Sequence, residues 1–151
     1  FFFKQKTAYE IKECDWSSDV CSSDLPEQVI AARQASFRLS AAALTGMKGV
    51  VDSGGDVKTQ LFAARAVASW ARVLPTTFPA GTGMGQSGAK TAARPEIWSN
   101  RADFEAKAAA YAEAADKLVD LAQAGDRPGF STQLDVIRST CSACHDAYRA
   151  K

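Results

Sequence analysis

The stretch Cys141-Ser142-Ala143-Cys144-His145 lies near the C-terminus, at the end of the last helix that the sequence predicts. Cys141, Cys144 and His145 stand at positions i, i+3 and i+4, which share one face of a helix and can address one flat ring. Two thiols at this spacing, followed at once by a histidine, are the attachment signal of a c-type haem. The stretch therefore predicts one haem c, attached through thioethers of Cys141 and Cys144, with His145 as the metal ligand.

Two other kinds of site use similar residues. A structural zinc site would need two further soft ligands, but His145 is the only histidine, and the remaining cysteines, Cys14 and Cys21, lie in an atypical N-terminal segment. A thioredoxin-like dithiol has its pair at a helix N-terminus, where the helix dipole lowers the thiol pKa. The present pair lies near a helix C-terminus, so we favour covalent haem over both alternatives.

The composition bounds the class of protein. The chain has 151 residues, a length that suits one domain, with 18 basic and 17 acidic side chains. This balance gives no nucleic-acid footprint, and no apolar run reaches the length of about 18 residues that indicates a membrane span. Alanine-rich stretches with helical spacing dominate. We therefore expect a soluble all-α protein with no nucleic-acid partner and no membrane span.

Residues 1–25 depart from this pattern. An apolar triplet is followed there by a polar run without helical or strand periodicity and without a small-residue cleavage site. The segment resembles a translated sequencing-adapter sequence, so we treat 1–25 as a non-native or disordered leader and 26–151 as the domain. The alternative is a genuine disordered tail, with a disulfide between Cys14 and Cys21. Because the leader occupies the place of a signal peptide, the sequence cannot be checked for one.

Four segments repeat apolar residues at spacings of three and four. Start and stop signals predict helices over about 26–53, 56–74, 100–125 and 128–149, with a short helical turn at 95–98. The long connection over 76–94 is rich in glycine and reads as a crossover. The expected core positions are Ile30, Arg33, Phe37, Ser40, Leu44, Met47 and Val51, then Val57, Leu61, Ala64, Ala68 and Ala71, then Phe104, Ala108, Tyr111, Ala115, Leu118 and Ala122, and finally Phe130, Leu134, Ile137, Cys141, Cys144 and Tyr148.

These segments predict an antiparallel four-helix bundle, a fold that holds cofactors between facing helices. Two of its loops are short and one is long. Because Cys141 and Cys144 continue the apolar stripe of the last helix, we expect the haem inside the bundle, near the C-terminal helix.

From Pro26 to Lys151 the chain resembles cytochrome c′, the class II c-type cytochromes with a C-terminal haem motif. The segments PEQVIAARQASF (26–37), ARPEIWS (93–99) and CSACHDAYRAK (141–151) carry the resemblance. The resemblance implies a homodimer formed through the first two helices, and the alanines around 41–43 and 63–68 would permit close packing there. It also implies that the residue four beyond the first-helix arginine decides the iron coordination. Methionine at that place gives six-coordinate, low-spin electron carriers, and an apolar residue gives cytochrome c′.

Phe37 occupies that place. The resemblance therefore implies a five-coordinate, high-spin iron with His145 as its only protein ligand, and a closed apolar distal pocket capped by the Phe37 ring. Two methionines bear on this expectation. Met47 lies about 15 Å further along the helix, too far to serve the same iron, whereas Met84 in the long connection is kept as a candidate sixth ligand.

Four further residues are expected to contact the haem. Arg33 falls on the core stripe, where an unpaired cation is rare, and the resemblance makes a haem propionate its partner, with Gln34 beside it. Arg149 is four residues beyond His145 and so on the same face, beside the imidazole; the alternative role is to stabilise the helix C-terminus. Thr91 is expected to border the haem from the connection.

The function that the resemblance implies is binding of small diatomic gases, nitric oxide foremost and carbon monoxide with it, together with one-electron redox. The alternative is a low-spin class II cytochrome that carries electrons between periplasmic redox proteins. Peroxidase-like catalysis is ranked last, because no distal histidine or carboxylate is available for acid-base work, so we do not expect an enzyme. Covalent haem attachment takes place on the oxidising side of the bacterial inner membrane, which predicts the periplasm.

Overall fold

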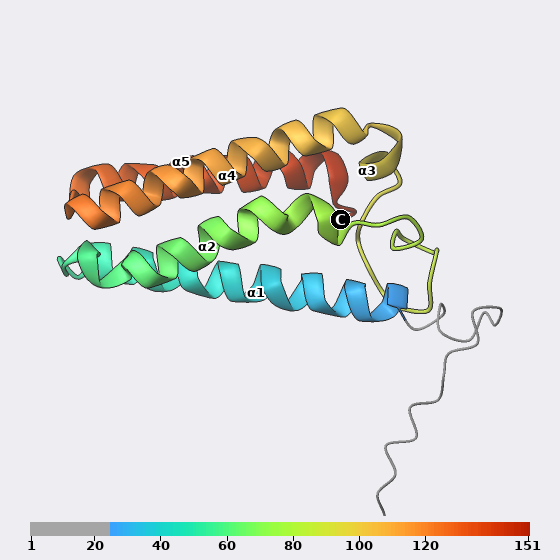
Figure 1. The fold of residues 1–151 in the computed structure, drawn as a ribbon, viewed down its shortest axis with the longest axis horizontal. Helices are drawn as coiled ribbons and strands as arrows, with labels where there is room; N and C mark the ends of the chain where they lie inside the picture. Colours follow the sequence, from blue (N-terminus) through green and yellow to red (C-terminus); the bar gives the residue numbers. More distant parts are fainter. Residues whose placement is uncertain (1–24) are drawn as a thin grey trace, which may run out of the picture.

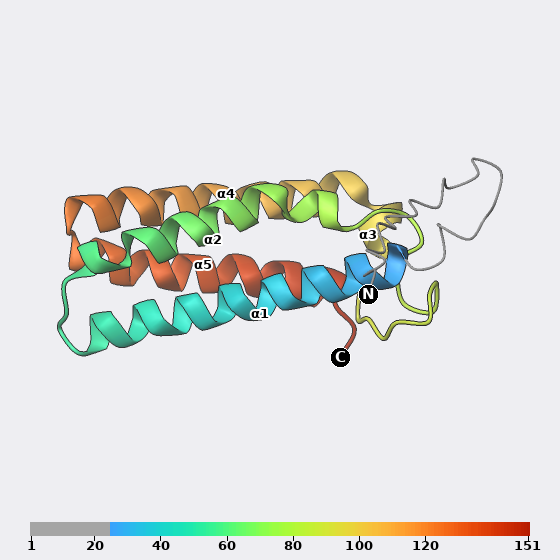
Figure 2. The ribbon, with the colours of Figure 1, turned by 60° about the horizontal axis from the view of Figure 1, so that its bottom comes forward.

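Four long helices lie alongside one another and form an all-α bundle, as the sequence predicts (Figures 1 and 2). The computed structural model describes residues 25–151, and the expectations for the preceding segment, including the Cys14–Cys21 disulfide, lie outside the described residues. The long helices are α1 (Leu25–Asp52), α2 (Leu61–Val73), α4 (Arg101–Ala124) and α5 (Arg127–Tyr148), and helices that follow one another run in opposite directions. Within 25–151, no helix combines the length and apolarity needed to cross a bilayer.

Three short elements complete the described chain: η2 (Val57–Gln60), η3 (Leu74–Thr77) and α3 (Glu96–Ser99). The second predicted helix therefore begins as a 3-10 turn, because the Asp56 side chain accepts a hydrogen bond from the Lys58 amide at 2.9 Å and tightens the first turn. The α-helical part starts only at Leu61. The predicted stop at Leu74-Pro75 is confirmed, since α2 ends at Val73.

The turn between α4 and α5 shows the expected stop and start signals. Gly125 has a φ of 75°, the left-handed conformation that glycine adopts without strain at the end of a helix. Asp126 then caps α5 by accepting a hydrogen bond from the Gly129 amide at 3.0 Å. The two helices are therefore held antiparallel by a very short connection.

The predicted stripes form the core, with every predicted position on α4 buried. Ala64 and Ala68 on α2 and Ala115 and Ala122 on α4 are at most 1% exposed, and these small side chains let α2 and α4 approach closely. Ala64 and Ala68 are buried as predicted, so within 63–68 these two alanines pack in the core and not at the dimer surface suggested for this segment. Ala41 and Ala42 on α1 are exposed, as expected.

The long connection after η3 is folded back onto the end of the bundle (Figure 1). Within it, the Met84 amide donates to the Ala93 carbonyl at 2.9 Å. The C-terminal residues then pair with its far end: Ala93 and Arg149 form an antiparallel bridge, and the Ala150 amide donates to the Ala92 carbonyl at 2.9 Å. This pairing brings residues 91–93 beside the end of α5.

Candidate haem site

A cavity of about 500 Å³ opens between α1, α4, α5 and the connection. Its size falls within the range of about 300 to 1,000 Å³ that is usual for ligand and cofactor sites. The cavity wall brings together every residue that the sequence predicts for the haem site: Arg33, Gln34, Phe37, Thr91, Cys141, Cys144, His145 and Arg149. Residues up to 116 positions apart in the chain therefore meet at one site.

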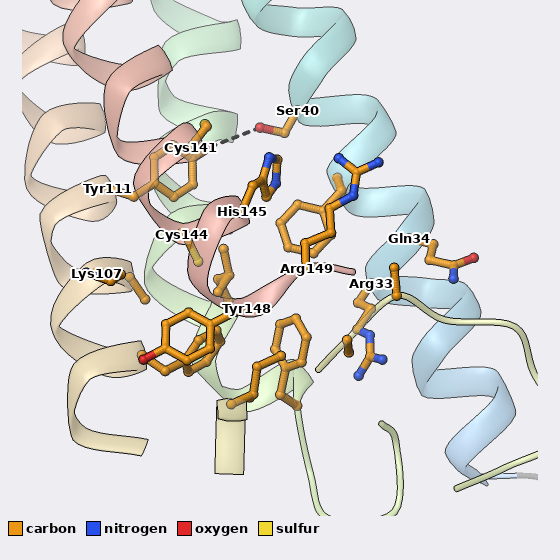
Figure 3. Close-up of a pocket in the computed structure, with 18 of the residues that line it drawn as sticks. Arg33, Gln34, Ser40, Lys107, Tyr111, Cys141, Cys144, His145, Tyr148 and Arg149 are labelled. Carbon is orange, nitrogen blue, oxygen red and sulfur yellow. Dashed lines mark hydrogen bonds between the residues drawn. The ribbon is translucent and has the colours of Figure 1, made fainter. Parts of the chain in front are cut away.

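The α5 side of the cavity carries the attachment motif (Figure 3). Cys141 and Cys144 are half-buried free thiols. Burial raises the pKa of both, and that of Cys144 reaches about 11, with the neighbouring Cys141 as a further cause. A raised thiol pKa is the reverse of the lowered thiol pKa on which the dithiol redox alternative depends. Within residues 25–151, no group of three or more histidine, cysteine, aspartate or glutamate side chains is arranged to hold a metal ion.

His145 lies one residue beyond the second thiol, and its imidazole is close to the Arg149 side chain in Figure 3. The pKa of His145 lies below its ordinary value, because partial burial disfavours the imidazolium and the Arg149 charge repels it; Asp146 opposes this. A neutral imidazole is the form that ligates a metal. α5 ends at Tyr148 and Arg149 follows it in an extended conformation, so Arg149 acts on His145 from just beyond the helix and not from a shared helix face.

Phe37 faces the cavity from α1 and is part of an aromatic cluster. Its ring meets Trp70 edge-on with ring centroids 5.1 Å apart and lies 6.4 Å from the Phe78 ring. Contacts of this kind add to the apolar burial of each ring. The position of Phe37 in the wall is therefore fixed by packing rather than by a polar partner.

Arg33 is buried at 3% exposure, and its guanidinium holds the connection against α1. It donates to the Thr82 hydroxyl at 2.7 Å, the Thr82 carbonyl at 2.5 Å, the Thr91 hydroxyl at 2.9 Å and the Thr77 carbonyl at 3.3 Å. It also lies 4.4 Å from the centre of the Phe78 ring. Burial lowers the pKa of Arg33. The sequence predicts a propionate as its partner, whereas the structure gives its terminal nitrogens neutral oxygens.

Contacts next to those of Arg33 hold the same part of the connection. Gln34 donates through Nε2 to the Lys90 carbonyl at 2.8 Å, and the Thr91 hydroxyl accepts from the Ala93 amide at 3.2 Å. Thr91 therefore reaches the cavity wall because α1 binds the connection at Thr91 itself and at Lys90 just before it. Sequence reasoning missed Thr82, which is 1% exposed. The only hint of it in the sequence is Arg33 on a core stripe, because a buried arginine must find hydrogen-bond acceptors in the fold.

A hydroxyl pair is the second feature that sequence reasoning missed. The Ser40 hydroxyl on α1 and the Tyr111 hydroxyl on α4 are 2.9 Å apart, both residues are buried, and both line the cavity (Figure 3). Burial raises the pKa of Tyr111, with the Ser40 bond acting in the opposite direction. The expected apolar pocket therefore includes one buried polar pair in its lining. Both residues stand on predicted core stripes, where a polar group requires a partner.

Neither methionine lines the cavity. Met84 is 45% exposed and lines a separate surface hollow with Lys90 and Lys151. Met47 is fully buried in the core, away from the cavity wall. The described residues of the wall therefore provide no methionine thioether as a sixth iron ligand.

The chemistry of the wall fits a haem. One side carries two thiols and an imidazole in attachment order, and most of the remaining lining is apolar. The charged residues of the lining are Arg33, Arg38, Lys107 and Arg149, and the lining includes no aspartate or glutamate. Such a wall suits a flat apolar macrocycle that carries two propionates.

Fold and site together define a four-helix bundle built around a c-type haem. The family model described as Cytochrome C' matches residues 28–149, so the chain belongs to the cytochrome c′ family and is a c-type haem protein. The cytochrome c' of Alcaligenes xylosoxydans xylosoxydans is 33% identical over 126 residues, which cover 83% of this chain and 96% of the relative.

Solved structures extend the comparison to the fold. A cytochrome c' with an unusual ligand-controlled dimer dissociation superposes with a TM-score of 0.77 at 26% identity, covering 83% of this chain and 97% of that one. The nitric oxide complex of a mutant cytochrome c prime from Alcaligenes xylosoxidans gives a TM-score of 0.74 at 31% identity, covering 83% and 96%.

Proposed function

We propose that this protein is a periplasmic protein that holds one haem c through Cys141 and Cys144, with His145 as the only protein ligand of a five-coordinate, high-spin iron. In this proposal it binds nitric oxide and carbon monoxide and undergoes one-electron redox, without being an enzyme. The observation that carries the proposal is Phe37, which stands in the wall on α1 while the attachment residues stand on α5. A phenyl ring has no lone pair to donate to iron.

Different side chains of the cavity would bind different parts of the haem. Cys141 and Cys144 would hold the haem covalently, and the neutral imidazole of His145 would ligate its iron. Arg149 and Lys107 in the lining would offset the propionate charges. Arg33 would do the same if a propionate replaced one of its present hydrogen-bond acceptors. The haem supplies an iron that changes its charge by one electron and has one open coordination position.

Phe37 controls access to that position. Its ring is packed against Trp70 and Phe78, so a ligand enters only when the ring shifts within this cluster. A small uncharged diatomic molecule loses little hydration when it enters such a site, whereas a charged ligand must replace its water with other hydrogen bonds. This difference supports nitric oxide and carbon monoxide as ligands. The nitric oxide complex of the relative with 31% identity is consistent with it.

The alternative function, a low-spin electron carrier, needs a sulfur ligand. Met84 lies in a different hollow and Met47 in the core, so the alternative requires the connection to rearrange. Electron exchange with periplasmic redox proteins remains part of either proposal. The cations Arg38, Lys107 and Arg149 in the cavity lining would favour partners with acidic surfaces.

We also propose a homodimer formed through α1 and α2. Leu39 on α1 is 71% exposed and Phe62 on α2 is 85% exposed, and a second copy of the chain would bury such side chains. The relative that shows dimer dissociation supports this proposal. Leu39→Glu and Phe62→Glu should shift the sedimentation coefficient to that of a monomer. Val136→Glu on α5, where Val136 is 43% exposed, should not.

Optical spectroscopy of the haem-loaded protein tests the coordination state. Ferric and ferrous spectra should be those of high-spin iron, and titration of the ferrous protein with carbon monoxide and nitric oxide should change them at micromolar protein. A low-spin spectrum without added ligand would support the electron-carrier alternative. The absence of any change with either gas would reject gas binding.

A further inference from the structure

Two tyrosines line the cavity, and their hydroxyl groups have different partners. Tyr111 on α4 is 7% exposed, and its hydroxyl lies 2.9 Å from that of Ser40. Tyr148 at the end of α5 is 4% exposed, and its hydroxyl donates to the Asp103 carboxylate at 2.5 Å. The two rings are almost equally buried at one cavity, so their reactivity should differ through their partners and not through exposure to solvent.

The single hydroxyl hydrogen of Tyr148 goes to Asp103. The Asn100 carbonyl also lies near this hydroxyl, at 3.4 Å, but the carboxylate is closer and charged, which makes it the stronger acceptor. The hydrogen bond from Tyr148 holds the pKa of Asp103 below its ordinary value, so the carboxylate is ionised at neutral pH. Burial, with this bond as a further cause, raises the pKa of Tyr148 to about 12, so the phenol keeps its hydrogen. A protonated phenol and an ionised base are therefore in direct contact.

Asp103 also connects this pair to solvent. Its side chain is 44% exposed, and its other oxygen lies 3.4 Å from the Lys107 ammonium group. Figure 3 shows Tyr148 extending from α5 towards α4 near Lys107. A proton that reaches Asp103 can therefore pass on to water. Ser40, the partner of Tyr111, is buried, and a neutral hydroxyl takes up no further proton at neutral pH.

A phenol becomes a strong acid when it loses an electron, so the electron leaves most readily where a base already accepts the hydrogen bond. We propose that Tyr148 is a nitration site, at which nitrogen dioxide removes an electron while Asp103 takes the proton. Nitrogen dioxide is the one-electron oxidant that forms when nitric oxide meets oxygen. The inference rests on the proposed function only for this source of the oxidant.

The reaction consumes two molecules of nitrogen dioxide. The first takes one electron from the Tyr148 phenol and becomes nitrite, and the O–H bond breaks as its proton passes to Asp103. The second combines with the resulting tyrosyl radical, forming a C–N bond at the ring carbon next to the one that bears the oxygen. The hydrogen of that ring carbon then moves to the phenol oxygen, which gives nitrotyrosine. Asp103 finally releases its proton to water.

The first test compares the two tyrosines within one sample of the ferric, haem-loaded protein. After exposure to a small excess of nitrogen dioxide, trypsin should release Tyr148 with residues 139–149 and Tyr111 with residues 108–117. Mass spectrometry then measures the fraction of each peptide that carries one nitro group. Tyr148 should be nitrated about threefold to tenfold more than Tyr111, although it is slightly less exposed.

The second test removes the base and keeps the shape of the side chain. In Asp103→Asn the amide oxygen can still accept the hydrogen bond but cannot hold the proton, so nitration of Tyr148 should fall to about the level of Tyr111. Asp116→Asn is the matched control. Asp116 also stands on α4 and is 47% exposed, but it does not line the cavity and pairs with Arg72. Its loss should leave nitration of Tyr148 unchanged.

Three results would overturn the inference: equal nitration of the two tyrosines, no nitration of either, or full nitration of Tyr148 in Asp103→Asn. The comparison within the unaltered protein needs no substitution, so it decides the matter even if the variant does not fold. The proposed function is tested separately, because the optical titration with nitric oxide involves no nitrogen dioxide. If nitric oxide binds and Tyr148 is not favoured, only this inference fails; if Tyr148 is favoured and nitric oxide does not bind, only the proposed function fails.

Discussion

The two walls of the cavity differ in how the chain builds them. The α5 wall takes its chemistry from five consecutive residues, 141–145, on a single helix. The opposite wall is assembled from α1, α4 and the connection, and its residues come from places as distant as Arg33 and Tyr111. The first wall determines which cofactor the protein holds. In the proposed function, the second selects the ligands that this cofactor takes.

A motif on one helix keeps its geometry when the packing of other elements changes. A wall assembled from several elements changes with any one of their contacts. Helical spacing alone aligns Cys141, Cys144 and His145, so almost any α5 helix would present them. The opposite wall depends on contacts between elements: the Arg33 clamp on Thr82 and Thr91, the Phe37 cluster and the hydroxyl pair. In the proposed function, a single substitution there should change which ligands bind while leaving Cys141, Cys144 and His145 in place.

Removal of both thiols takes the attachment residues out of the α5 wall and has the largest expected effect. Cys141→Ala/Cys144→Ala should lose all covalent haem, because no other described cysteine lines the cavity. Haem staining after denaturing electrophoresis measures this directly. Ser142→Ala, exposed between the two thiols, should stain normally, and a stained band in the double variant would contradict the proposed attachment.

Phe37→Met tests the opposite wall alone. A thioether at this place can donate a lone pair to iron, so the spectrum should change from high-spin to low-spin while the haem stays covalently bound. Phe62→Met is the matched control, because Phe62 is 85% exposed on α2 and does not line the cavity. A high-spin spectrum in the Phe37 variant would mean that this ring does not face the iron.

Leu118→Ala tests the packed core of the bundle. Leu118 on α4 is fully buried, and truncation leaves a void that should lower the free energy of unfolding by about 2 to 5 kcal/mol. Denaturant unfolding of the haem-loaded protein measures the loss. Val136→Ala on α5, at 43% exposure, should change it by no more than about 0.5 kcal/mol. Equal losses in the two variants would contradict the described core.

Arg33→Lys loosens the opposite wall without removing its charge. A lysine cannot make the several hydrogen bonds that the guanidinium makes to Thr82 and Thr91. The free energy of unfolding should therefore fall by about 1 to 3 kcal/mol. Hydrogen exchange should show faster exchange of the Met84 amide, which is bonded to the Ala93 carbonyl in the clamped connection. Arg38→Lys, an exposed cation on the same helix, should leave this exchange rate unchanged.

The smallest effect concerns the bond that fastens the end of α5 to α4. The Tyr148 hydroxyl donates to the Asp103 carboxylate at 2.5 Å. This bond holds the pKa of Asp103 below its ordinary value of 3.8, while burial, with the bond as a further cause, raises the pKa of Tyr148 from 10.0 to about 12. Each shift links the stability of the fold to pH.

The sign of the effect follows from which state binds the proton more tightly. The folded protein binds the Asp103 proton less tightly than the unfolded chain, so this stabilisation is present above about pH 4 and is lost as the pH falls. The folded protein holds the Tyr148 proton more tightly, so that stabilisation is lost between about pH 10 and 12. The stability difference between the unaltered protein and Tyr148→Phe, measured by urea unfolding, should shrink at both extremes. Parallel pH profiles would contradict this.

The sequence by itself determined the features that depend on spacing along one helix. The haem motif, the buried stripes and the stop at Gly125 follow from helical periodicity and backbone preference, which act within a few residues. Even the meeting of Arg33, Phe37 and His145 at one cavity was predictable, because a family resemblance supplied the arrangement of the helices.

Only the tertiary structure decided the partners of the polar groups. Arg33 could be predicted to need acceptors, but the choice of Thr82 depends on how the connection folds back, which no local pattern specifies. Ser40 and Tyr111 are separated by 71 positions, and their bond exists only because α1 and α4 bring those two stripe positions together. Helical period places a side chain on a face; only the packing of one helix against another decides what it meets there.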